Sequence, residues 1–149
     1  MSAMGLIVKS TGLESVTARL KDFQKKAVNL TVPLKQGGLL MLRSINKNFN
    51  SSGRPIPWKP LAYSTLKQKM KLGYSIKPLL RKGFLRASIA TRATRDTLTV
   101  GTSITYAPYH QYGTKNIPQR KFLVFQKEDI HRMNKLVVQY LISKESSGG

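Results

Sequence analysis

Residues able to carry acid–base or metal chemistry are scarce in this chain. Its 149 residues include two histidines, His110 and His131, six acidic residues and no cysteine. A zinc site takes about four ligands, so both histidines would have to recruit two of the scattered acids. We therefore expect neither a metal nor a cofactor, and we interpret His110 as a hydrogen-bonded loop residue and His131 as a surface residue.

No catalytic motif stands out either. No serine occupies a G-x-S-x-G turn, and no stretch matches G-x-G-x-x-G or G-x-x-x-x-G-K-[ST]. The adjacent acids Glu128 and Asp129 would point about 100° apart on a helix, which favours capping over paired acid–base work. These patterns predict a protein that is not an enzyme.

Shape-determining residues gather in the stretch 106–125, YAPYHQYGTKNIPQRKFLVF. Its tyrosines recur at every third residue, as Tyr106, Tyr109 and Tyr112. This spacing predicts one or two tight helical turns, which Gly113 ends, followed by a loop that Pro118 keeps extended. A buried segment that can add a strand is expected at 121–125. Such a stretch is typical of a docking or fold-defining loop.

The charge of the chain points to its surroundings. With 26 basic and 6 acidic residues, the net charge is +20. This imbalance predicts a partner of opposite sign: nucleic acid, an acidic protein surface, or an assembly threaded by DNA. No disulfide can form, no apolar run approaches the ~20 residues that cross a membrane, and the start is a poor signal peptide. We expect a cytoplasm-like compartment and no membrane partner.

The elements that would position these residues begin with a short strand or arm at 1–10. Three- and four-residue apolar steps then predict a helix over 12–29. Pro33 separates it from a second helix over about 35–49. The side chains expected to face inward on this second helix are Leu39, Leu42, Ile45 and Phe49.

Residues 50–60, NSSGRPIPWKP, are the clearest non-helical stretch. Three prolines stiffen it, so Trp58 sits on an extended arm. The tryptophan either covers its own core or anchors in a neighbour's pocket, and the sequence favours neither.

The remaining pattern is of mixed type. A basic helix is predicted at 64–71, an antiparallel hairpin near 88–102 and a closing helix at about 127–142. The polar residues 144–149 are expected to form a flexible tail. The chain is interpreted as one domain over 1–149 of the α+β class: N-terminal helices, a small mostly antiparallel sheet and a C-terminal helix.

Five basic residues come nearest to a cluster: Arg81, Lys82, Arg86, Arg92 and Arg95. They form either a solvated face or a surface lining a channel, where DNA would be attracted without regard to its sequence.

Three blocks together resemble the phage virion-morphogenesis, or tail-completion, family, typified by the G protein of phage Mu. They are SSGRPIPWKPLAYSTLKQK (51–69), LLRKGFLRASI (79–89) followed by VGTS (100–103), and YAPYHQYGT…IPQRKFL (106–123). The resemblance covers about residues 35–142. The chain departs from the family pattern at Lys82, where a hydroxyl is usual, and at Gln119, where a small residue is frequent.

This resemblance implies a structural protein of the virion's head–tail junction, assembled in the host cytoplasm. Such proteins are similar to tail terminators: subunits form a ring, often sixfold, between the head connector or stopper protein and the tail tube protein. The ring caps the finished tail, joins it to the filled head and lets genomic DNA pass through its lumen.

By the same resemblance, the loops 50–60 and 106–121 are expected to reach a neighbouring subunit. The residues implied are Trp58, Tyr106, His110, Gln111, Tyr112, Gly113, Pro118, Arg120 and Phe122. Gly113 would serve backbone geometry, Arg120 a buried or interfacial polar contact, and Trp58 an anchor. Each is open to the alternative of a fold-determining role, which is favoured for Tyr106, Gly113 and Phe122.

Two rivals remain open at this stage. One is a basic nucleic-acid-binding protein without enzymatic activity, whose charge is its function. The other, far less favoured because no acid–base constellation is present, is an enzyme acting on phosphate-bearing or cell-wall substrates.

Overall fold

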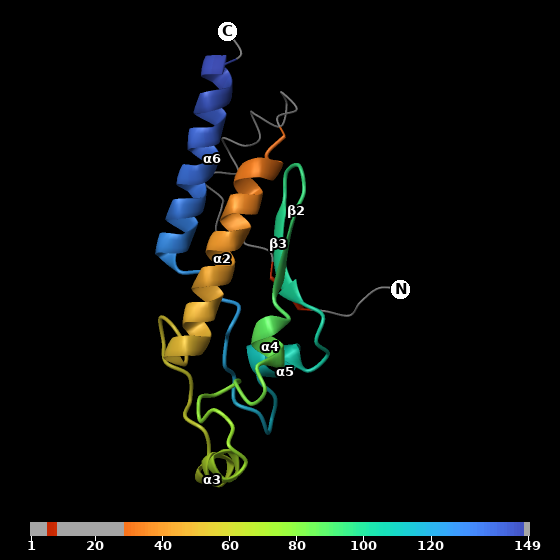
Figure 1. The fold of residues 1–149 in the computed structure, drawn as a ribbon, viewed down its shortest axis with the longest axis vertical. Helices are drawn as coiled ribbons and strands as arrows, with labels where there is room; N and C mark the ends of the chain where they lie inside the picture. Colours follow the sequence, from red (N-terminus) through yellow and green to blue (C-terminus); the bar gives the residue numbers. More distant parts are fainter. Residues whose placement is uncertain (1–5, 9–28, 148–149) are drawn as a thin grey trace.

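The computed structural model describes residues 6–8 and 29–147. The described elements, in chain order, are β1 (Leu6–Val8), α2 (Thr31–Ser51), α3 (Tyr63–Lys71), α4 (Phe84–Ala87), β2 (Ala90–Ala93), β3 (Leu98–Thr102), α5 (Ala107–Tyr112) and α6 (Lys127–Ser147). The long helix α2 packs against α6 on one side and against the strands β2 and β3 on the other (Figure 1). The short helix α3 lies at the far end from the hairpin turn. This arrangement confirms the α+β class.

The sheet is antiparallel throughout, in the order β1-β3-β2. β2 and β3 form the predicted hairpin, and Leu6–Val8 pairs with the other edge of β3, which confirms the strand expected near the start of the chain. At the hairpin turn, the backbone amide of Leu30 donates to the carbonyl of Arg95 at 2.8 Å. The turn is thereby tied to the start of α2.

The second predicted helix begins earlier than expected. α2 starts at Thr31, so Pro33 lies within its first turn and does not separate two helices. Proline is tolerated there because the first amides of a helix have no partner within the helix. The helix predicted over 12–29 lies outside the described residues except for its last residue, 29.

The packed face of α2 also differs from the predicted stripe. Ile45 and Phe49 are buried as predicted, but Leu39 is 59% exposed. The buried face continues through Met41 and Gly37 in its place. A Cβ on Gly37 would lie 2.2 Å from Sδ and Cε of Met133, so its absence lets α6 approach closely. A prediction based only on large apolar side chains misses a helix face where small residues allow close packing.

Aromatic packing fills the core below this contact. The rings of Phe49 and Trp58 meet edge-on with their centroids 5.8 Å apart, and the ring centroids of Phe49 and Phe122 are also 5.8 Å apart. Trp58 is only 8% exposed, and its Nε1–H donates to the carbonyl of Lys121 at 2.9 Å. Trp58 therefore lies in the core of its own chain.

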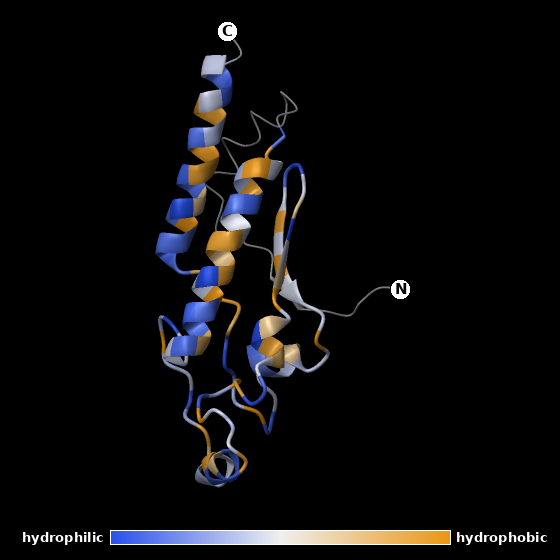
Figure 2. Cartoon of the chain, in the orientation of Figure 1, coloured by the Kyte–Doolittle hydropathy of each residue, from blue (hydrophilic) through white to orange (hydrophobic). Residues whose placement is uncertain are grey.

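The last helix follows its prediction with a later end. α6 buries Met133, Val137 and Leu141, and it is otherwise largely polar (Figure 2). Asp129 lies in the first turn, where its carboxylate accepts the amide of Gln126 at 2.9 Å and the hydroxyl of Ser44. The helix continues to Ser147, so 144–147 are helical where a flexible tail was expected.

Candidate functional site

The tyrosine-rich block folds into α5 and a loop that returns along it. Gly113 ends the helix with φ 78° and ψ 163°, and a Cβ there would lie 3.0 Å from the amide nitrogen of Gln119. Glycine is favoured by both the positive φ and the close approach. The amide of Arg120 then donates to the carbonyl of His110 at 2.8 Å, which fixes the returning loop against α5.

Gln111 is the central polar residue of this block. It is 5% exposed, and its Oε1 accepts the amides of Phe122 and Leu123, each at 3.1 Å. Its Nε2 donates to the carbonyl of Leu123 at 3.0 Å. From α2, Nδ2 of Asn48 donates to the carbonyl of Phe122 at 2.9 Å.

These side-chain bonds explain why the strand expected at 121–125 was a wrong prediction. Backbone groups of an extended segment need partners, and here Gln111 and Asn48 supply them where a neighbouring strand would otherwise do so. Phe122 and Leu123 are still buried, as predicted.

Arg120 joins the two motif loops within one chain. Arg120 is 6% exposed, and its guanidinium donates to the carbonyls of Lys59 at 2.9 Å and Pro60 at 3.2 Å. Burial lowers the pKa of Arg120 below its ordinary value. The fold thus brings Arg120 and Trp58 together with Gln111, Gly113 and Phe122 as an internal network.

Two tyrosines of the same block face solvent. Tyr109 and Tyr112 are 53% and 62% exposed, so α5 presents an aromatic outer face. Tyr106, which precedes α5 and is 42% exposed, lines the cleft described below. His110 lies half-buried beneath Tyr106, with the two rings edge-on at 6.0 Å. Its Nδ1 is buried without a hydrogen-bond partner among the described residues. Burial, followed by the charge of Arg120, lowers the pKa of His110.

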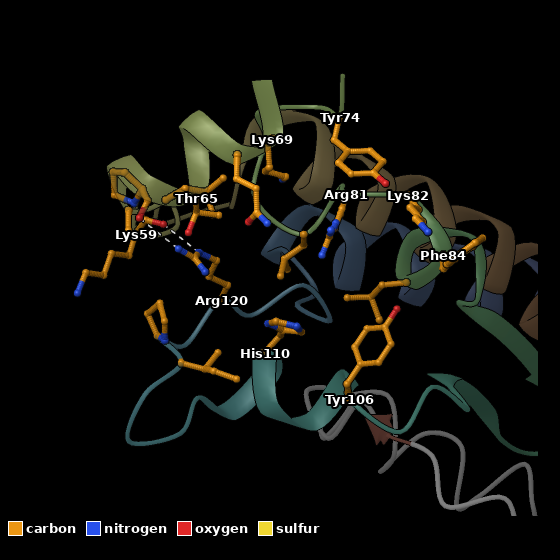
Figure 3. Close-up of a pocket in the computed structure, with 18 of the residues that line it drawn as sticks. Lys59, Thr65, Lys69, Tyr74, Arg81, Lys82, Phe84, Tyr106, His110 and Arg120 are labelled. Atoms are coloured by element: carbon orange, nitrogen blue, oxygen red, sulfur yellow. Dashed lines mark hydrogen bonds between the residues drawn. The ribbon is translucent and has the colours of Figure 1, made fainter. Parts of the chain in front are cut away.

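A cleft of about 1130 Å³ opens between α3 and the α5 loop. Figure 3 shows its cationic walls, to which α3, the loop before α4 and the returning loop all contribute. The basic side chains lining it are Lys59, Lys69, Arg81, Lys82 and Arg120. Among the described residues that line the cleft, His110 is the one other basic side chain, and none is acidic.

Lys69 is the second buried cation of this cleft. It is 6% exposed, and its Nζ donates to the carbonyl of Lys77 at 2.7 Å. Burial lowers the pKa of Lys69, and the charges of Arg120 and Arg81 lower it further. Arg81 itself stacks over the ring of Tyr74 at 5.2 Å.

The five basic residues grouped from the sequence do not form one cluster. Arg81 and Lys82 line the cleft, whereas Arg86 donates to Oδ1 of Asn46 at 2.9 Å. Arg92 lies on β2, and Arg95 lies in the hairpin turn at the other end of the molecule (Figure 1). No sequence pattern predicts that Lys59, Lys69 and Arg120 converge on Arg81, because these residues are distant along the chain and no spacing links them.

Other classes of site find no support among the described residues. No group of three or more His, Asp or Glu in this part of the chain is placed to hold a metal ion. Within the same described ranges, no helix has the length and apolarity to span a membrane.

Comparison with known proteins links the chain to one family. The family model described as the phage virion morphogenesis family matches residues 11–142. Neither a curated protein nor a solved structure matched the chain. The match includes both motif loops, the cleft and the hairpin.

Proposed function

The chain belongs to the phage virion morphogenesis family, and we propose that it acts as a structural protein of the head–tail junction. Subunits associate into a ring, which we propose to be sixfold. The ring caps the finished tail, binds the tail tube protein on one side and the head connector or stopper protein on the other, and lets genomic DNA pass through its lumen. No chemical reaction is needed for this role.

The observation that carries the proposal is the exposed aromatic face of α5. Tyrosine is enriched in protein interfaces, where it supplies a large contact area at a small entropic cost. Here Tyr109 and Tyr112 are more than half exposed, while Gln111 between them is buried and fixed by three hydrogen bonds. A rigid helix that presents its tyrosines outward supports a contact with a neighbouring subunit.

The charge supports the passage of DNA. A net charge of +20 per subunit attracts phosphates without recognising bases. Arg92 and Arg95 are exposed on the hairpin, and we propose that they face the lumen together with Arg86. Since they lie on a different element from α5, the same subunit can offer one surface to DNA and another to its neighbour.

The test is the molar mass of the purified protein by light scattering, at low and at high salt. We expect a discrete species near six times the chain mass of 16.7 kDa, retained in high salt. Replacing Tyr109 and Tyr112 together with alanine should release monomers. Tyr63→Ala is the matched control, because Tyr63 is 79% exposed on α3.

Two results would contradict the proposal. One is a double variant that assembles and joins heads to tails as well as the unchanged protein. The other is a protein that stays monomeric both in solution and on purified tails.

The charge also favours a second candidate, a monomeric protein that binds nucleic acid without sequence preference. Binding to short duplexes would then be tight, and its logarithm would fall steeply and linearly with the logarithm of salt concentration. A monomer with this behaviour would place the second candidate first.

A further inference from the structure

We propose that the cationic cleft between α3 and the α5 loop binds an acidic, partly apolar peptide segment of another protein. The ligand chemistry is a pair of carboxylates flanked by apolar side chains. The inference concerns a site separate from the aromatic face of α5, and it does not require the ring proposed above.

The first observation is that two cations are buried in this cleft without a carboxylate from the described part of the chain. Lys69 and Arg120 are each 6% exposed, and among residues 6–8 and 29–147 their hydrogen bonds go only to backbone carbonyls. Buried charges are normally paired, because desolvation of a lone charge is costly. Lys69 donates one of its three N–H groups to these bonds and Arg120 two of its five, so N–H donors remain for an incoming anion.

The second observation is that the positive charges of these groups repel one another. The pKa of Lys69 is lowered by burial and by the neighbouring charges of Arg120 and Arg81, and that of His110 by burial and by Arg120. The buried Nδ1 of His110 also lacks a hydrogen-bond partner within the part of the chain that the structure describes. A carboxylate placed among these groups would relieve the repulsion and accept their unused donors.

The lining of the cleft favours a peptide over a small anion. Phe84 and Leu72 are 64% and 50% exposed on its walls, and Ile117 and Pro118 line the side near α5. A volume of about 1130 Å³ exceeds what one carboxylate or phosphate needs. Apolar walls around a few fixed polar groups are the usual composition of a ligand site.

Duplex DNA fits the same charges less well. Its phosphates lie on a stiff, convex surface, which reaches exposed cations such as Arg81 and Lys82 but not side chains buried within a hollow. A carboxylate on a flexible side chain can enter and reach Lys69 and Arg120. The depth of these two cations therefore favours a protein segment.

A second copy of this chain is also a poor occupant. Asp129 is buried and hydrogen-bonded to Ser44 and Gln126. The other acids in the described part of the chain are single residues on the hairpin turn and on α6: Asp96, Glu128 and Glu145. Charge complementarity points instead to a different, acidic partner.

The test measures binding of a labelled synthetic peptide of alternating glutamate and leucine by fluorescence anisotropy, using the full chain at constant salt. The control peptide carries glutamine at every glutamate position. We expect the glutamate peptide to bind at least tenfold more tightly. Replacing Arg81 and Lys82 with glutamine should weaken it about tenfold, as expected for two exposed charge contacts of about 0.7 kcal/mol each. The matched control also introduces glutamine, at Arg132 and Lys135 on α6, which are both exposed and outside the cleft. This variant should alter the affinity less than twofold.

A third variant separates binding from folding. Lys69→Met removes an unpaired buried cation, so binding should fall at least tenfold while the unfolding midpoint is unchanged or raised. Equal losses in the two charge-matched double variants would overturn the proposal, because attraction would then be diffuse. A Lys69→Met protein that binds normally would overturn it as well. So would an oligonucleotide of equal charge whose binding requires the same cleft residues, which would assign the cleft to nucleic acid.

Discussion

Replacing Gln111 with leucine tests whether one side chain holds the motif loop in place. Leucine has a similar size, so the change removes hydrogen bonding without leaving a large cavity. It deprives the amides of Phe122 and Leu123 and the carbonyl of Leu123 of the partner seen in the structure. No other hydrogen bond to these three backbone groups is present among the described residues.

The magnitude follows from the number of groups left unpaired. A buried backbone group that loses its partner costs about 1–3 kcal/mol, and some relaxation will occur. Three such groups predict a loss of about 3–5 kcal/mol in the free energy of unfolding. Domains of this size are stable by about 5–15 kcal/mol, so the loss would be a large share of the total.

Urea unfolding followed by the fluorescence of Trp58, the only tryptophan, is a suitable assay. With a urea dependence of about 2 kcal/mol/M, the midpoint should fall by about 1.5–2.5 M. Gln139→Leu, at an exposed position on α6, is the matched control and should change stability by less than about 0.5 kcal/mol. Both proteins are compared at one concentration, because association would shift the midpoint. A loss below about 1 kcal/mol for Gln111→Leu would refute the assigned role.

Two further perturbations test the loops around this residue. Gly53→Ala should lower the urea midpoint of unfolding far more than Gly73→Ala. Both glycines have positive φ, but only at Gly53 would a Cβ meet backbone, 2.6 Å from the amide nitrogen of Trp58. Equal losses in the two variants would contradict this. The pKa of His110 is lowered, so the folded chain binds fewer protons there, and stability should fall as pH drops below the unfolded pKa of about 6.5. NMR titration should show that His110 becomes protonated below that pH. A His110→Gln variant that keeps the full pH dependence of stability would refute the assignment.

The elements that sequence predicts well are those set by local pattern. The alternation of Thr91 and Ala93 with polar neighbours predicts one strand of the hairpin, and the three-residue tyrosine period predicts α5. Gly113 ends α5 as expected, because a positive φ is a local requirement. In each case the decisive information lies within a few residues of the element.

The features that sequence misses depend on contacts between distant segments. The segment 121–125 has the composition of a strand, but its backbone partners are the side chains of Gln111 and Asn48. Leu39 fits an apolar stripe, yet the packed face is decided by Met133 of α6 approaching Gly37. No local pattern records either pairing.

The cleft is the clearest case of this limit. A basic cluster was inferred from proximity along the chain, and the fold separated it into Arg81 and Lys82 at the cleft and Arg92 and Arg95 on the hairpin. The cations that complete the cleft come from the loop before α3, from α3 itself and from the returning α5 loop. Charge clustering in space follows from the topology, which the sequence pattern alone does not determine.

The motif residues divide into two sets, and substitutions in the two sets should impair the protein for different reasons. Trp58, Gln111 and Arg120 are buried and bond to their own chain, so substitutions there should act through stability. Tyr109 and Tyr112 point outward without such bonds, so substitutions there should spare stability and affect docking. A loss of virion assembly is therefore informative about an interface only where the unfolding midpoint is retained. Measured together, stability and assembly separate the internal frame from the surfaces that it presents.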